Sequence, residues 1–376
     1  MVAVTVPGAS GSTNDFIFQT TNNSTFQTNL LNTLSNALTT SGLVFANDTS
    51  TTPTVSTGGL VVNSSSPTNT TVPAGYSAIL NTATAPVTIT GNNGSNQTVL
   101  AGTGGTTFYA QSGESGTIVA AGGNNVLTTP TSGGGNWTQV LDGAGTNLVA
   151  EGSGNDLLLT SSGKNTVFLG SGADTVASAG TADTIIAGAG NATTFGSAGA
   201  TGLYFVGTGT FAHVADGAAD TLVGGAGSSS VAAYATNNGS VTYFGSATGN
   251  LFMAGPGNVT LNAAGSSGVN NFFDNAAAGD SATMMGGTGS NFFGAGAGNA
   301  TMMGGSGVNE FQFVNGNAGS NDLIQNWNAH DYLELTGYTT GPTMSVANGS
   351  TVISLSDGTH ITIANVTSIP TSHILT

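Results

Sequence analysis

Hydrophobic and polar positions alternate in short blocks along most of this chain. From about residue 87 to residue 314, apolar triplets such as TVL, TII, TMM and NFF are separated by turns of Gly, Asn and Ser. Alternation over a few residues, bounded by turn-forming residues, predicts short β-strands joined by tight turns. We therefore expect an all-β fold over this stretch.

The alternation has a period of nine residues. Glycine recurs at Gly145, Gly154, Gly163 and Gly172, an Asn or Asp follows two places later, and an apolar residue two places after that. Nine residues suit a turn of about six and a strand of about three, and two such units make one coil of a parallel β-solenoid with strands stacked about 4.8 Å apart. The apolar position is expected to face inward, and glycine to permit the close turns. The predicted fold class is a parallel β-solenoid, or β-roll, of stacked glycine-rich turns.

The two ends of the chain differ from the repeats. In residues 1–60, the stretch NDFIFQT predicts a strand, and Ser24–Leu38 places its Phe and Leu residues on one helical face. We expect a strand–helix segment and linker over 1–60, a solenoid over 61–315 with its register clearest over 142–204, and a β cap over 316–376.

The composition of the chain argues against several classes of partner and location. Among 376 residues there are 17 acids, one base (Lys164) and no cysteine, and the formal charge is −16. Nucleic acid is therefore not an expected partner, because phosphates need Lys or Arg. No basic and apolar leader opens the sequence, and no apolar run reaches the roughly 18 residues of a membrane span, so neither a cleaved N-terminal signal peptide nor membrane insertion is expected.

Several stretches resemble the RTX family, whose glycine-rich nonapeptide repeat is G-G-x-G-x-D-x-U-x. They are GSGNDLLL, GSGADTV and GGSGVNEFQF, followed by Gly316–Tyr338 and Ser356–Thr376, which resemble the cap that ends many RTX proteins. The resemblance implies export by a type I secretion machinery and an extracellular or cell-surface location. It also implies that residues 316–376 include the secretion region.

The same resemblance implies bound Ca²⁺ at a few sites. Asp156 and Asp174 lie 18 residues apart and so fall in one row of turns, where the backbone around Gly152, Gly154 and Gly172 would assist them. Asp183 falls in the opposite row and makes a weaker site or none, and Asp322 and Asp331 are further candidates in the cap. The alternative is that Asp156 and Asp174 are merely solvated turn residues. Where Asn291 and Asn309 replace the aspartate, ladders of Asn are expected to hold the turns instead.

The ninth position of the repeat is expected to face outward. In one row it is occupied by Phe168, Ile186 and Tyr204, which form a candidate assembly surface. Phe16 and Phe18 in the first strand are a second candidate. That strand would either cap one end of the solenoid or pair with the edge of a neighbouring molecule.

The leading functional hypothesis is a secreted structural protein that self-assembles into a homopolymer: a matrix filament, a surface layer or a biofilm component. The alternative is an adhesin or an ice-binding module, for which Thr166, Thr175, Thr184 and Thr193 occupy an outward position of the repeat. An enzyme is not expected. The four histidines lack catalytic or metal-binding spacing, and a polysaccharide lyase would need more bases than Lys164.

Overall fold

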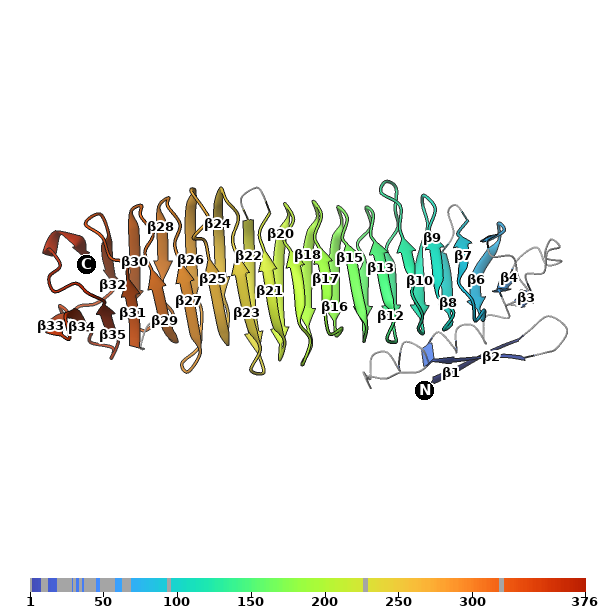
Figure 1. Ribbon diagram of the computed structural model, residues 1–376, viewed down its shortest axis with the longest axis horizontal. Helices are drawn as coiled ribbons and strands as arrows, with labels where there is room; N and C mark the ends of the chain where they lie inside the picture. The colour runs from blue at the N-terminus through green and yellow to red at the C-terminus, as the bar shows by residue number, and fades with distance from the viewer. Residues whose placement is uncertain are drawn as a thin grey trace. The chain divides into compact units, whose positions relative to one another are not determined.

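The computed structural model describes residues 2–7, 13–18, 29, 32–33, 36, 45–47, 58–62, 69–92, 96–225, 229–317 and 321–376. The chain divides into two compact units, residues 1–193 and 194–376, and β18 (Asn191–Gly196) contains the boundary. Strands make up nearly all of the regular structure, in two sheets called sheet I and sheet II below (Figure 1).

The first unit begins with an antiparallel pair, β1 (Val2–Pro7) and β2 (Thr13–Phe18). Its sheet I strands are β3 (Phe45–Asn47), β4 (Gly58–Val62), β6 (Tyr76–Asn81), β8 (Asn96–Ala101), β10 (Ser115–Ala120), β12 (Trp137–Leu141), β14 (Leu157–Thr160) and β16 (Ala173–Ser178). Its sheet II strands are β5 (Asn69–Thr71), β7 (Val87–Thr90), β9 (Thr106–Tyr109), β11 (Val126–Thr128), β13 (Thr146–Ala150), β15 (Lys164–Phe168) and β17 (Asp183–Ile186).

The second unit continues the alternation. Its sheet I strands are β20 (Thr210–Asp216), β22 (Ser229–Thr236), β24 (Gly249–Ala254), β26 (Val269–Asp274), β28 (Asn291–Gly294), β30 (Asn309–Val314), β32 (Tyr332–Thr336) and β36 (Ile374–Leu375). Its sheet II strands are β19 (Gly202–Phe205), β21 (Ala219–Val223), β23 (Ser240–Phe244), β25 (Asn258–Asn262), β27 (Ser281–Met285), β29 (Asn299–Met303), β31 (Asn321–Gln325), β33 (Thr343–Ala347), β34 (Ser350–Ser354) and β35 (His360–Ile363). A short 3-10 helix, Thr371–His373, precedes β36.

Successive strands of one sheet pair in parallel, and each coil contributes one strand to each sheet. In the first unit, β13 pairs with β15 so that Asn147 lies opposite Asn165 and Val149 opposite Val167. In the second unit the coils are more variable, and in the pairing of β25 with β27 Asn258 lies opposite Ser281. The all-β parallel solenoid predicted from the nine-residue period is confirmed.

The apolar position of the repeat faces inward, as expected. Val149, Val167 and Ile185 are fully buried, one above the other, in the first unit. In the second unit the interior holds a stack of aromatic rings, because parallel strands bring equivalent residues together at about 4.8 Å. Ring centroids lie 4.6 Å apart for Phe252–Phe272, 4.8 Å for Phe272–Phe293 and 4.9 Å for Phe293–Phe311, with nearly parallel planes.

The parallel pattern changes at the C-terminus. Strands β33, β34 and β35 form an antiparallel meander, attached by the parallel pairing of β35 with β31. The meander lies within residues 316–376, where the sequence predicts a β cap. At the N-terminus, Asn29, Asn32, Thr33 and Asn36 are helical and exposed, whereas the apolar face expected for residues 24–38 lies outside the described residues.

The prediction that the Tyr204 side chain faces outward is wrong. Its side chain is fully buried, and Phe205 is exposed in its place. The cause is one extra residue in the preceding turn, where Gly199 adopts a φ of +80° and Gly202 rather than Thr201 opens the strand. A shift of one residue exchanges the two faces of a strand.

The aromatic stack predicts a strong dependence of stability on its middle member. We expect Phe293→Ala to lower the free energy of unfolding by about 3–5 kcal/mol, because it leaves a cavity between two rings. Phe273→Ala is the matched control in the same sheet, since that ring is 39% exposed, and it should cost less than about 1 kcal/mol. Denaturant unfolding followed by circular dichroism measures both, and equal losses would contradict the role given to the stack.

Candidate metal centre

The Asn or Asp position of the repeat faces the interior. Asn147, Asp156, Asn165, Asp174 and Asp183 are all buried, although each lies next to a turn. The reason is the alternation of a strand: the polar position and the inward apolar position are two residues apart and share a face. A carboxylate there loses water and needs hydrogen bonds or a cation in its place.

Glycine lets neighbouring turns approach closely enough to enclose this position. A Cβ atom added to Gly172 would lie 1.7 Å from the carbonyl oxygen of Gly154, and one added to Gly170 would lie 1.5 Å from that of Gly152. No side chain fits at these contacts. The turn carbonyls of one coil are therefore packed directly against the next coil.

Asp156 and Asp174 follow one another in the same row of turns. Asp156 Oδ1 accepts the backbone N–H of Trp137 at 2.7 Å, and Asp174 Oδ1 accepts the backbone N–H of Asp156 at 3.1 Å. The second oxygen of each, Oδ2, is buried and has no hydrogen-bond partner. Burial raises the pKa of Asp174 to about 6. These two carboxylates are incompletely compensated by the protein.

Two further polar side chains lie beside this pair, and the sequence analysis missed both. Glu151 follows β13, and Gln139 occupies an inward position of β12 between Ile118 and Leu158 of the neighbouring coils. The Gln139 Nε2 group donates to Glu151 Oε1 at 2.7 Å. Burial, followed by the adjoining carboxyl of Asp156, raises the pKa of Glu151 well above its ordinary value.

A signal for both residues was present in the sequence. Glu151 stands where the repeat pattern has its first glycine, and Gln139 interrupts a column of apolar residues. Because no nine-residue spacing links Gln139 to Glu151, their pairing needed the structure.

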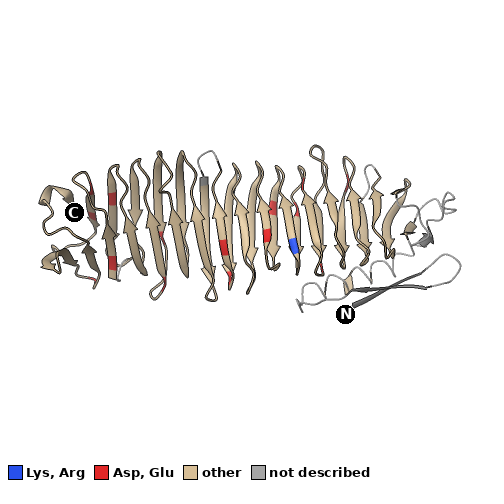
Figure 2. Cartoon of the chain, viewed as in Figure 1, with Lys and Arg blue, Asp and Glu red and all other residues tan. Residues whose placement is uncertain are grey.

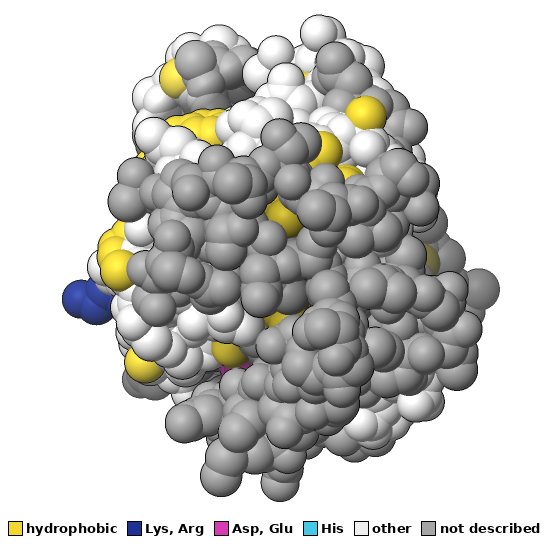
Figure 3. Space-filling model, turned by 90° about the vertical axis from the view of Figure 1, so that its right-hand side faces the viewer, with side chains coloured by type: hydrophobic (Ala, Val, Ile, Leu, Met, Phe, Trp, Pro, Cys, Tyr) yellow, Lys and Arg dark blue, Asp and Glu magenta, His cyan; other side chains and the backbone are white. Residues whose placement is uncertain are grey.

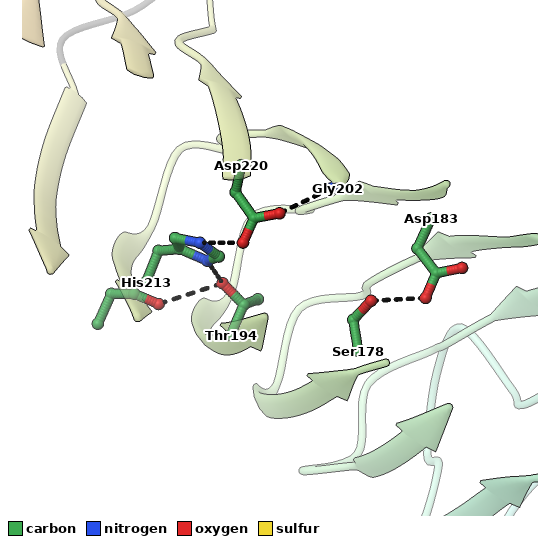
Figure 4. Close-up of polar contacts among 7 residues, drawn as sticks. Ser178, Asp183, Thr194, Gly202, His213 and Asp220 are labelled. Carbon is green, nitrogen blue, oxygen red and sulfur yellow. Dashed lines mark hydrogen bonds and ion pairs between the residues drawn. The ribbon is translucent and has the colours of Figure 1, made fainter. Parts of the chain in front are cut away.

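Asp183, by contrast, is fully provided with donors. Its Oδ1 accepts the backbone and side-chain amides of Asn165, and its Oδ2 accepts the hydroxyl of Thr160. The same Oδ2 also accepts the hydroxyl of Ser178 (Figure 4). Four donors on one carboxylate satisfy both of its oxygens. Nothing about Asp183 calls for a metal.

In the second unit, Asp220 is paired with a histidine. Its Oδ2 lies 3.0 Å from His213 Nε2, its Oδ1 accepts the Gly202 N–H at 2.6 Å, and His213 Nδ1 lies 2.8 Å from Thr194 Oγ1 (Figure 4). A hydroxyl, an imidazole and a carboxylate in a row resemble a nucleophile with its base and orienting acid. All three side chains are nevertheless buried, so no substrate reaches them. The histidine supplies the partner that Asp220 needs.

The two aspartates of the cap region also have protein donors. Asp331 Oδ1 accepts the backbone and side-chain amides of Asn309, and its Oδ2 accepts the backbone N–H of Asn328. Asp322 Oδ1 accepts the backbone N–H of Ala300 at 2.8 Å. Neither candidate resembles the incompletely compensated pair in the first unit.

Ladders of asparagine fill the remaining polar positions. In the second unit each side-chain amide donates to the next carbonyl oxygen at 2.7–2.9 Å, along the series Asn250, Asn270, Asn291, Asn309 and Asp331. The first unit has a similar series, Asn125, Asn147, Asn165 and Asp183. The ladder expected at Asn291 and Asn309 is confirmed, and each ladder ends on an aspartate.

Comparison with protein families agrees with this geometry. A family model described as the RTX calcium-binding nonapeptide repeat, with four copies, matches residues 143–176, 152–184 and 214–238. This chain carries RTX nonapeptide repeats. No curated protein matches it significantly.

RTX repeats belong to a calcium-binding, generally secreted class of sequence. Whether a carboxylate of this chain suits calcium depends on whether its buried oxygens already have hydrogen-bond donors. Asp156 and Asp174 fit, since each carries a buried oxygen without a donor. Asp183 and Asp220 do not, although their repeats lie within the matched ranges. Within the described ranges, no helical segment has the length and apolarity that a bilayer crossing requires.

The His213–Asp220 pair predicts a specific double-variant result. His213→Gln removes the imidazole that lies against the buried Asp220 carboxylate and should lower the free energy of unfolding by about 1–3 kcal/mol, the usual cost of leaving a buried acceptor without its partner. Adding Asp220→Asn replaces that carboxylate and should restore part of the loss. Denaturant unfolding of the two single variants and the double variant measures the coupling. Additive losses would show that the two side chains do not compensate one another.

Proposed function

We propose that this chain is a secreted, non-enzymatic structural protein that assembles with copies of itself outside the cell, with calcium supporting the fold of the first unit. The assemblies in question are a matrix filament, a surface layer or a biofilm component. The RTX repeats and the solenoid support a secreted, calcium-binding solenoid protein. Self-association is inferred from the outer surface of sheet II.

The observation that carries the proposal is an outward column of uncharged side chains on sheet II. In the first unit, consecutive strands place in register Tyr109, Thr128, Ala150, Phe168 and Ile186. In the second unit the column holds Phe205, Val223, Phe244, Asn262, Met285 and Met303. Tyr109, Phe168 and Phe244 are each more than 40% exposed, although they are large apolar groups. Rows of exposed aromatics on a regular sheet are typical of contact surfaces.

The distribution of charge favours a second copy as the partner. Buried side chains account for ten of the 17 acids: Glu114, Asp142, Glu151, Asp156, Asp174, Asp183, Asp220, Asp274, Asp322 and Asp331. Charged residues are also few along the chain (Figure 2), and on the face turned towards the viewer in Figure 3 scattered apolar side chains lie among uncharged groups, with one basic side chain at the edge. Two copies can therefore meet along sheet II with little charge repulsion, despite the net charge of −16.

Calcium enters the proposal at Asp156 and Asp174, assisted by the turn backbone at Gly152, Gly154 and Gly172. The two unpartnered carboxylate oxygens support this assignment. A bound divalent cation there supplies the positive charge that the buried carboxylates lack. Type I export and an extracellular location follow from the RTX repeats and remain part of the proposal, as does the secretion role of residues 316–376. Phe16 and Phe18 lie on β2, but their side chains are outside the described residues.

One observation favours an ice-binding module as the second candidate. Beside the apolar column, sheet II of the second unit has a row of outward threonines in consecutive register: Thr221, Thr242, Thr260, Thr283 and Thr301. Thr166 and Thr184 are likewise in register in the first unit. Thermal hysteresis of the purified protein would favour this candidate over the structural one, and its absence would remove it.

Self-assembly predicts a dependence on the exposed ring of Phe168. We expect the protein to form ordered filaments or sheets by negative-stain electron microscopy, and Phe168→Thr to raise the concentration needed for assembly at least tenfold. The matched control is Phe195→Thr, because Phe195 is 39% exposed but lies on β18 of sheet I. Wild-type protein that remains monomeric in calcium at every concentration would overturn the proposal. Equal effects of the two variants would move the contact away from the sheet II column.

A further inference from the structure

A cluster of buried carboxyl and amide side chains, called the acidic cluster below, lies inside the first unit and involves residues that the repeat pattern does not specify. We propose that Glu151 and Asp156, together with the amide oxygen of Gln139, hold one hard divalent cation of the calcium class in the solenoid interior. The inference rests on the calcium part of the proposed function and goes beyond it, since the repeats predict only Asp156 and Asp174 as side-chain ligands.

The three side chains are almost completely enclosed. Gln139 is 0%, Glu151 7% and Asp156 4% exposed. Each has one oxygen without a hydrogen-bond partner: Gln139 Oε1, Glu151 Oε2 and Asp156 Oδ2. Three unsatisfied acceptors close together in a dry interior are unusual, because each costs about 1–3 kcal/mol of desolvation when left unpaired.

The hydrogen bond from Gln139 to Glu151 fixes the two side chains of the acidic cluster relative to one another. The Nε2 group donates to Glu151 Oε1 at 2.7 Å, which fixes the amide with its oxygen free. The carboxyl groups of Glu151 and Asp156 interact directly, and Asp174 adds a third negative charge nearby. The described residues hold no group of three His, Cys, Asp or Glu side chains placed for a metal ion, so the amide oxygen is needed as the third side-chain ligand.

Among the described residues, no Lys or Arg side chain lies within this acidic cluster. Lys164 is the only Lys or Arg in the chain, and its side chain is exposed. Two touching carboxylates in a low-dielectric interior cannot both be ionised without a cation between them. Hard divalent cations prefer carboxylate and amide oxygens, and these are the free atoms here. Because the three side chains are buried, the cation has to enter while the coils stack, which couples its binding to folding.

Terbium luminescence offers a direct test, because Tb³⁺ uses the same oxygen ligands and is excited by a nearby indole. Trp137 is one of two tryptophans in the chain, and its backbone N–H donates to Asp156 Oδ1. The full chain is refolded with increasing Tb³⁺, and bound Tb³⁺ is then displaced with Ca²⁺. We expect sensitised emission from the wild type, and its loss in Trp137→Phe while Ca²⁺ binding by calorimetry remains.

Two substitutions then address the new ligands. Glu151→Gln should weaken binding at least tenfold, and Gln139→Leu should weaken it severalfold while restoring the apolar column of Ile118 and Leu158. The matched control is Glu114→Gln, since Glu114 is also fully buried with one unpartnered oxygen but has a different environment. It should leave the affinity within about twofold. Circular dichroism checks that each variant has folded.

The outcomes separate this inference from the proposed function. If Glu151→Gln and Gln139→Leu bind as the wild type does while Asp174→Asn does not, calcium lies in the Asp156–Asp174 row alone and the inference is wrong. If the wild type binds neither Tb³⁺ nor Ca²⁺, a shared proton compensates the carboxylates, and both the inference and the calcium part of the proposed function fail. The assembly measured by electron microscopy is independent of either result.

Discussion

The close stacking of coils is the constraint on which the other features depend. Parallel strands about 4.8 Å apart bring each residue directly against its equivalent in the next coil. At the turns the approach is closer still. A Cβ atom at position 154 would collide with the carbonyl oxygen of Gly135, and one at position 172 with the carbonyl oxygen of Gly154, so only glycine fits at both positions. Every interior position therefore forms a column of equivalent side chains from successive coils. Each side chain in a column must pack against, or form a hydrogen bond with, a side chain of the same type. Apolar and aromatic residues meet this demand readily, as the ring stack from Phe252 to Phe311 shows.

The polar columns meet the same demand less easily. An asparagine both donates and accepts, so a column of asparagines satisfies itself by passing one hydrogen bond along. An aspartate only accepts, and two in succession leave acceptor facing acceptor. This explains why both asparagine ladders end on a single aspartate, Asp183 or Asp331, with extra donors around it. It also explains the cost at Asp156 and Asp174, where two carboxylates follow one another.

The sequence predicts the repeating features well and the exceptions poorly. Period, strand direction, inward apolar columns and glycine turns all follow from local alternation, which the stacking repeats from coil to coil. The outward place predicted for Tyr204 failed because one added residue near Gly199 reverses the faces of β19. His213 and Gln139 could not be assigned partners because their contacts cross the interior from one sheet to the other, and no fixed spacing encodes such contacts. The sequence analysis assigned the polar position to the turns. Its spacing of two residues from the inward apolar position already indicates that both side chains face the interior.

The departures from the nonapeptide pattern therefore have a common physical cause, which is the supply of hydrogen-bond donors around each polar position. Where the repeat position keeps an aspartate, the surrounding coils contain hydroxyls, amides or an imidazole for it, except at Asp156 and Asp174, where Glu151 adds a further buried carboxyl group instead. A solenoid coil contacts only its neighbours, so this excess charge is not relieved by residues elsewhere. The proposed cation dependence is therefore expected in the coils around β12, β14 and β16, while the aspartates that end the asparagine ladders already have protein donors. A chain built in this way can keep most of its stacking intact in the absence of metal, because the ladders and the aromatic stack need no cation.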